Sequence, residues 1–124
     1  MKIPLLIAIG GAAGAVARYS ITGAIHNAWG GHFPYGTLMV NVMGSFALGV
    51  LYVLVEEKHW LGPEARALLA VGLLGALTTF SAFSLETVKL LSTGALLKAA
   101  LNTLGNVMLC FLLTWIAILL TRQI

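Results

Sequence analysis

The sequence has no aspartate, one cysteine and few charged residues of any kind. Only 9% of its 124 residues are charged, whereas a soluble domain carries about 25%. Cys110 has no histidine near it, and no two acidic residues share a helix face. The chain therefore offers neither an activated nucleophile nor an acid–base pair, and we do not expect an enzyme.

Metal and nucleic-acid sites also lack the residues they need. His26, His32 and His59 fall in predicted loops and form no ligand pair at helical spacing, which argues against a histidine metal site. The net charge of +3 is spread thinly along the chain. Because no basic patch with interleaved aromatic residues exists, nucleic acid is not an expected partner.

What the sequence has instead is long apolar segments. Hydrophobic residues make up 60% of the chain, and four segments reach the roughly 20 residues that a membrane-spanning helix needs. The predicted spans are residues 3–25, 34–55, 65–91 and 96–120. We predict an all-α membrane protein with a single four-helix transmembrane domain over residues 1–124. Since no cleavable signal peptide is evident, we expect a multi-pass protein of the bacterial inner membrane.

The third segment is unusual at its centre. It is about 27 residues long, more than a straight span needs, and its middle carries two glycines and several hydroxyl side chains. Within a bilayer, irregular backbone is tolerated only where it faces protein or a wet cavity. We predict two half-helices with a break between Gly75 and Thr79. Carbonyls freed near Gly75 and Thr78 would suit a monovalent cation, unless threonine side chains and water satisfy them.

Polar side chains recur at every fourth position on two other spans, so each set lies on one helix face. The sets are Thr37, Asn41 and Ser45 in the second span and Asn102, Asn106 and Cys110 in the fourth. Interhelical hydrogen bonds would explain both stripes without any ligand, but such bonds average only about 0.6 kcal/mol in membranes. That small stabilisation favours an aqueous pathway, with interhelical bonding as the open alternative.

The available donors indicate a negatively charged ligand. Asparagine amides supply N–H groups, and Thr37, Thr79, Ser81 and Ser84 supply O–H groups. Arg18 is the one cation within or near the bilayer, although snorkelling to the headgroups explains its position equally well.

Two aromatic residues and one acid lie in the same region. Phe80 and Phe83 share a face if the second half-helix begins near Thr79, and the positive edges of their rings can meet a small anion. Such a pair is ordinarily core packing. Glu86, the only acid inside a predicted span, either pairs with Lys89 or tunes the pathway.

Positive charges are nearly balanced between the two ends of the predicted spans. Lys2, Lys58, Arg66 and Arg122 on one side compare with Lys89, Lys98 and Arg18 on the other. Because this bias is weak, both insertion in two orientations and a mild preference for a cytoplasmic N-terminus remain open.

Three motifs, in order along nearly the whole chain, resemble the small fluoride channels of the CrcB/Fluc family. They are Gly-Gly-Ala-Ala-Gly-Ala-Val-Ala-Arg-Tyr at 10–19, Gly-Thr-Leu-Met-Val-Asn-Val-Met-Gly-Ser at 36–45 and Gly-Leu-Leu-Gly-Ala-Leu-Thr-Thr-Phe-Ser-Ala-Phe-Ser at 72–84. The third motif is the most specific of the three.

The resemblance implies a dual-topology antiparallel homodimer in the lipid membrane that conducts fluoride passively through two pores. The pathway residues that it implies are Phe80, Phe83, Asn41, Thr37, Thr79, Ser81 and Arg18, and the stripe of the fourth span adds Asn102 and Asn106. It also implies a structural sodium ion held by the backbone carbonyls of Gly75 and Thr78. Family members often carry Tyr and Ser on the fourth-span stripe, so this chain departs from the pattern there, and Ala82 removes one hydroxyl.

Two other functions compete with this interpretation. A small dual-topology proton-coupled drug exporter needs a carboxylate in an early span, and this chain has none before Glu56. A non-conducting membrane subunit would use its polar stripes only to bind partner helices.

Overall fold

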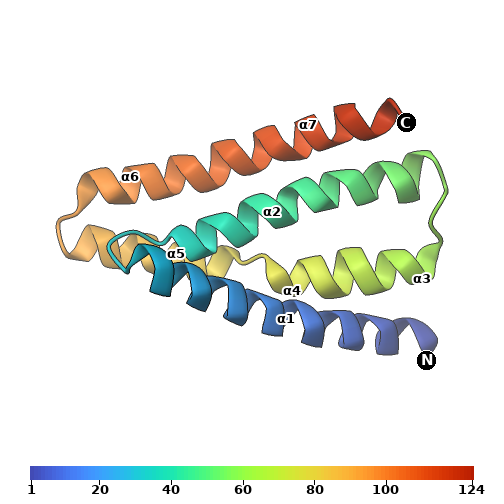
Figure 1. Cartoon of the computed structure of the whole chain (residues 1–124), viewed down its shortest axis with the longest axis horizontal. Helices are drawn as coiled ribbons and strands as arrows, with labels where there is room; N and C mark the ends of the chain where they lie inside the picture. The colour runs from blue at the N-terminus through green and yellow to red at the C-terminus, as the bar shows by residue number, and fades with distance from the viewer.

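The structure, a computed structural model, describes residues 1–124 as four long helical spans joined by short connections (Figure 1). The spans cover Lys2–Trp29, Tyr35–Glu57, Pro63–Ser92 and Leu96–Arg122, and each is long and apolar enough to cross a membrane. The prediction of an all-α protein with four such helices is confirmed, although the helices run a few residues past most predicted ends. One consequence is that His26 lies inside the first helix, so its placement in a loop was wrong.

Three of the four spans contain turns with wider, π-type hydrogen bonding. The first span is α1 (Lys2–Trp29), and the second is α2 (Tyr35–Tyr52) followed by η1 (Val53–Glu57). The third consists of α3 (Pro63–Ala65), η2 (Arg66–Leu74), α4 (Gly75–Leu77) and α5 (Phe80–Ser92). The fourth consists of α6 (Leu96–Leu104), η3 (Gly105–Leu109) and α7 (Cys110–Arg122). Such widened turns are frequent at functional sites.

Glycines bring the first and third spans into backbone contact. A methyl group added at Gly10 would meet the Leu68 carbonyl oxygen of η2, and one added at Gly14 would meet the Leu73 carbonyl. Gly72 of η2 lies equally close to α1, since a methyl group added there would meet the Ile7 carbonyl oxygen and the Gly10 Cα. Without a hydrophobic driving force between helices in lipid, this close approach is what supplies packing energy. α1 is therefore joined to η2 and α4, whereas α2 packs mainly on α7 and α5 packs on α6.

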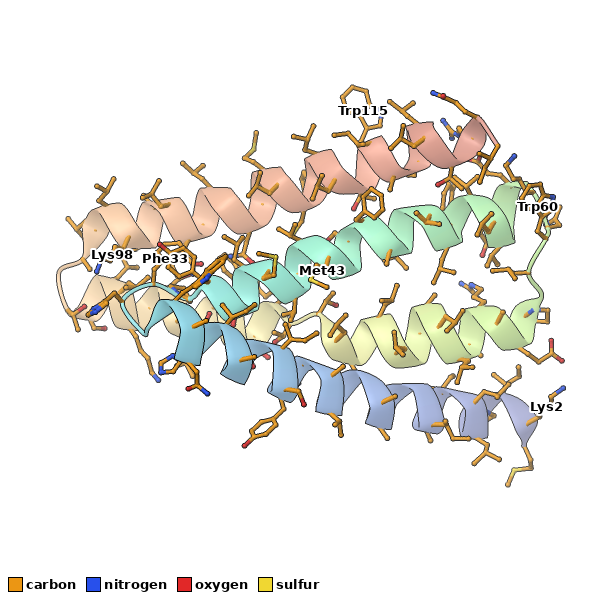
Figure 2. The ribbon with its side chains drawn as sticks, viewed as in Figure 1. Lys2, Phe33, Met43, Trp60, Lys98 and Trp115 are labelled. Atoms are coloured by element: carbon orange, nitrogen blue, oxygen red, sulfur yellow. The ribbon has the colours of Figure 1, made fainter.

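Both chain termini lie at the same end of the bundle, beside the connection from η1 to α3 (Figure 1). Lys2 and Trp60 mark this end, and Phe33 and Lys98 mark the opposite one (Figure 2). Three ion pairs tie the terminal end together: Lys2–Glu64 at 3.1 Å, Arg66–Glu56 at 3.1 Å and Arg122–Glu57 at 2.6 Å. Because solvent reaches all three pairs, each contributes little to stability.

The third span loses its helical backbone at two residues. Thr78 has φ/ψ of −81°/154° and Thr79 has −154°/117°, both extended conformations. The helix resumes at Phe80, with the Thr79 hydroxyl capping it by accepting from the Ala82 N–H at 3.1 Å. The predicted interruption is therefore present, but α4 and α5 continue almost in line, so the span as a whole is only slightly bent (Figure 1).

The glycine contacts lead to a stability prediction. We expect Gly10→Ala to lower the thermal midpoint of the detergent-solubilised protein by several degrees, because overpacking at a backbone contact costs about 1–3 kcal/mol. Gly11→Ala is the matched control, since a methyl group there meets no atom within 4 Å. Equal midpoints for the two variants would contradict the packing described.

Candidate functional site: an interrupted helix between two cavities

The amide of Asn41 replaces the helical partners that Thr79 loses. The Thr79 N–H donates to Asn41 Oδ1 at 2.7 Å, and Asn41 Nδ2 donates to the Thr79 carbonyl at 3.1 Å. Thr79 is buried, with 7% of its surface exposed. Since an unpaired backbone group in a bilayer costs several kcal/mol, this two-point contact from α2 makes the interruption tolerable.

The interruption removes the helical donors of several backbone carbonyls, two of them because side chains take those donors. In a continuous helix the Gly75 carbonyl would accept from the Thr79 N–H, which here donates to Asn41. The Thr78 carbonyl would accept from the Ala82 N–H, which here donates to the Thr79 hydroxyl. The carbonyls of Gly75 and Thr78, the predicted sodium ligands, are thus the two that side chains deprive of a helical donor. Carbonyl oxygens of this kind suit a hard cation.

The asparagines of the two polar stripes bond to one another. Asn41 Nδ2 donates to Asn106 Oδ1 at 2.8 Å. Asn106 Nδ2 donates to the Asn102 carbonyl at 2.9 Å and to Asn102 Oδ1 at 3.1 Å. Interhelical hydrogen bonding, the open alternative for these stripes, is therefore what a single chain shows, and both N–H groups of Asn41 are engaged within it.

A first cavity of about 400 Å³ lies on one side of the interruption. The predicted site residues that line it are Asn41, Gly75, Thr78, Thr79, Phe80, Phe83 and Asn106, together with Ser45 and Cys110. The rings of Phe80 and Phe83 meet edge to face, with centroids 5.4 Å apart. Phe83 is buried, whereas Phe80 is 77% exposed on the surface of the chain. The pair therefore forms part of the cavity wall, where a ring edge can contact a ligand.

A second cavity of about 480 Å³ lies on the other side, and its lining includes Arg18, Thr37, Thr79, Ser81 and Glu86. The hydroxyls of Thr79 and Ser81 are 3.2 Å apart. Thr79 is the only residue that lines both cavities. Thr37, Ser81 and Arg18 therefore line the second cavity and the aromatic pair lines the first. Ser84 lines neither cavity, because its hydroxyl donates to the Phe80 carbonyl at 2.9 Å.

Glu86 does not pair with Lys89, one of its two predicted roles. Its Oε1 instead accepts from the Thr37 hydroxyl at 2.7 Å, and none of the three ion pairs of the chain includes it. Its Oε2 is buried without a hydrogen-bond partner. The carboxyl group therefore belongs to the wall of the second cavity.

Two residues complete the account of the site. Asn102, predicted to lie along the pathway, lines neither cavity and is fully buried, with 0% exposure. Sequence reasoning missed Thr87, which accepts from Asn102 Nδ2 at 3.0 Å. Its place two helical turns after Thr79 was the available signal, but a threonine in a helix usually bonds only its own backbone.

Comparison with known proteins gives consistent matches. The family model described as CrcB-like protein, Camphor Resistance (CrcB), matches residues 5–118. A fluoride-specific ion channel FluC of Shewanella amazonensis is 55% identical over 116 residues, which are 94% of this chain and 93% of the relative. A FluC protein of Shewanella oneidensis is 52% identical over 112 residues, 90% of each chain. Another, from Methylococcus capsulatus, is 49% identical over 118 residues, which are 95% of this chain but 52% of that longer relative.

The contact between Asn41 and Thr79 can be tested by its effect on stability. We expect Asn41→Ala to lower the free energy of unfolding by about 2–3 kcal/mol, because it leaves two buried backbone groups unpaired. Asn27→Ala is the control, since Asn27 lies on the exposed end of α1. The measurement is the thermal midpoint in detergent, and equal losses in the two variants would show that Asn41 does not support the interruption.

Proposed function

The chain belongs to the CrcB family of bacterial multi-pass membrane proteins, and from this premise we propose that it is a fluoride channel. The relatives that it matches are named as ion channels, and it is not an enzyme. The observation that carries the proposal is the interrupted span, which sets hydroxyl, amide and aromatic-edge donors around two cavities that share Thr79.

Fluoride needs donors that replace its strongly held water. Burying an ion without partners costs several kcal/mol or more. In the second cavity the guanidinium of Arg18 and the hydroxyl of Ser81 are available to an anion. In the first cavity, the positive ring edges of Phe80 and Phe83 are available to contact the anion. A larger halide such as chloride would fit a pathway of this kind badly.

The contacts of Asn41 define what an ion must do between the cavities. Both N–H groups of Asn41 already donate, one to the Thr79 carbonyl and one to Asn106. An ion that takes an N–H from Asn41 therefore competes with a protein acceptor. This exchange keeps the amide paired at every stage, which avoids the cost of an unsatisfied buried donor.

The exposed parts of the site support an antiparallel homodimer with two pores. Gly75, Phe80 and Ser81 are exposed on a single chain, next to the interrupted backbone. Irregular backbone does not face lipid, so a second copy is the natural cover for it. The nearly balanced positive charges of the two ends are compatible with insertion in both orientations.

The runner-up function, a proton-coupled drug exporter, has no support from the site. The first two spans contain no carboxylate before Glu56, and Glu56 lies at the end of its span in an ion pair with Arg66. An exchanger of protons for cations needs a carboxylate within reach of its substrate. We therefore do not propose this function.

Fluoride efflux from proteoliposomes tests the proposed function. Vesicles loaded with potassium fluoride and treated with valinomycin should release fluoride to an electrode much faster than protein-free vesicles, and chloride-loaded vesicles should not release chloride. Fluoride efflux at the rate of the protein-free control would end the proposal.

Variants at the two phenylalanines test the pathway itself. We expect Phe80→Ile and Phe83→Ile each to reduce fluoride efflux at least tenfold with an unchanged elution volume in size-exclusion chromatography, because isoleucine has no positive ring edge. Phe46→Ile is the matched control, as Phe46 lies on α2 outside both cavities. Efflux as fast as that of the control would remove the phenylalanines from the pathway.

Sodium is the ion that the family resemblance implies at the freed carbonyls. We propose that the backbone carbonyls of Gly75 and Thr78 from two subunits would hold one sodium ion, whose charge would offset the partial negative charge of these oxygens. A ligand that binds only the folded state stabilises it by RT ln(1 + [L]/Kd). The thermal midpoint should therefore rise when sodium replaces N-methylglucamine at constant ionic strength, and rise less with potassium. A midpoint independent of the cation would contradict the site.

A further inference from the structure

Five hydrogen bonds form a path that leaves α5 and returns to it. The path begins at the Thr79 N–H, which donates to Asn41, and passes to Asn106 and then to Asn102. Asn102 Nδ2 donates to the Thr87 hydroxyl at 3.0 Å, and that hydroxyl donates to the Phe83 carbonyl at 2.8 Å. Every side chain on the path accepts from the residue before it and donates to the residue after it.

Backbone groups fix the direction of this path at both ends. The Thr79 N–H can only donate, so it requires the oxygen of the Asn41 amide on its side. The Phe83 carbonyl can only accept, so it requires the hydrogen of the Thr87 hydroxyl. With its hydrogen committed, the Thr87 oxygen accepts, and the Asn102 amide must present its N–H there. Between these ends, only one orientation of each asparagine amide places its nitrogen against an oxygen of the next residue.

We propose that Thr87 and Asn102 are positioning residues that hold the Asn106 amide where its oxygen accepts from Asn41. Neither residue lines either cavity, and Asn102 is fully buried. They act on the site through Asn106, whose Nδ2 donates to both the backbone carbonyl and the Oδ1 of Asn102 and whose Oδ1 accepts from Asn41. This assigns Asn102 a role different from contact with the ion.

A change at Thr87 can affect Asn41 because every hydrogen bond on the path points in the same direction, from donor to acceptor. Hydrogen bonds in a head-to-tail chain polarise one another, and the interior of a protein strengthens that effect. Removing the Thr87 oxygen leaves the buried Asn102 N–H without its acceptor, so the Asn102 amide is then held only at its oxygen, by Asn106. The loss then passes to Asn106 and Asn41, although Thr87 is three hydrogen bonds from Asn41.

The matched variants are Thr87→Val and Thr121→Val. Each removes a threonine hydroxyl that donates to the carbonyl four residues earlier, Phe83 for Thr87 and Ala117 for Thr121. Only Thr87 also accepts from an asparagine. Thr87→Ser restores the hydroxyl, and Thr87→Cys keeps the volume with a weak acceptor, for use if the valine variant does not fold.

The first measurement does not depend on transport. The chain has four asparagines, Asn27, Asn41, Asn102 and Asn106, so selective ¹⁵N-asparagine labelling gives four side-chain amide pairs in an NMR spectrum. Thr87→Val should shift the pairs of Asn102, Asn106 and Asn41 and leave that of Asn27 in place. Thr121→Val should shift none, and Thr87→Ser should bring the Asn41 pair back toward its original position. A shift confined to Asn102 would overturn the inference.

The second measurement rests on the proposed function. Thr87→Val should lower fluoride efflux on the order of fivefold relative to Thr121→Val, the factor that corresponds to the net worth of one hydrogen bond, and Thr87→Ser should restore it. If the unaltered protein conducts fluoride and both valine variants conduct equally, the positioning role is wrong. If the unaltered protein conducts no fluoride, the proposed function fails, and the NMR result still decides whether Thr87 acts on Asn41.

Discussion

The requirement that every backbone group inside a bilayer be paired within the protein governs this structure. Thr78 and Thr79 leave the helix at membrane depth, and the break persists because one amide, that of Asn41, supplies both a donor and an acceptor to Thr79. The freed carbonyl of Gly75 follows from that contact, because the Thr79 N–H that would pair with it donates to Asn41 instead. An apolar residue at position 41 could not support the same backbone.

Much of the fold could be predicted from local properties of the sequence. Four apolar segments of sufficient length predicted four spans, and the glycines and hydroxyls of the third predicted its interruption. The widened turns and the extension of α1 to Trp29 were not predictable, because both depend on how the spans pack. The small bend of the third span has the same origin, since α4 is held by α1 and α5 by α6.

The site was predictable as a set of residues but not as a set of partners. Phe80, Phe83 and Thr79 line cavities, and their place in an ion pathway stays a prediction. The stripe rule correctly put Asn41 and Asn106 on inner faces, yet it could not tell that they bond to each other, since that depends on the register of α2 against η3. For the same reason Thr87 was missed and Asn102 was assigned to the pathway. Periodicity shows which residues share a helix face, but a hydrogen bond depends on the distance between two helices.

The third span is divided between two neighbours at the point where its helix stops. η2 and α4 are locked to α1 by glycine contacts too close for any side chain to intervene, while α5 is joined to α6 across a short turn. The two halves of the third span are thus held by different neighbours, and Asn41 of α2 bonds to the two-residue interruption between them. Because Thr78 and Thr79 have extended backbone, the two halves are joined there by two non-helical residues and not by a continuous helix.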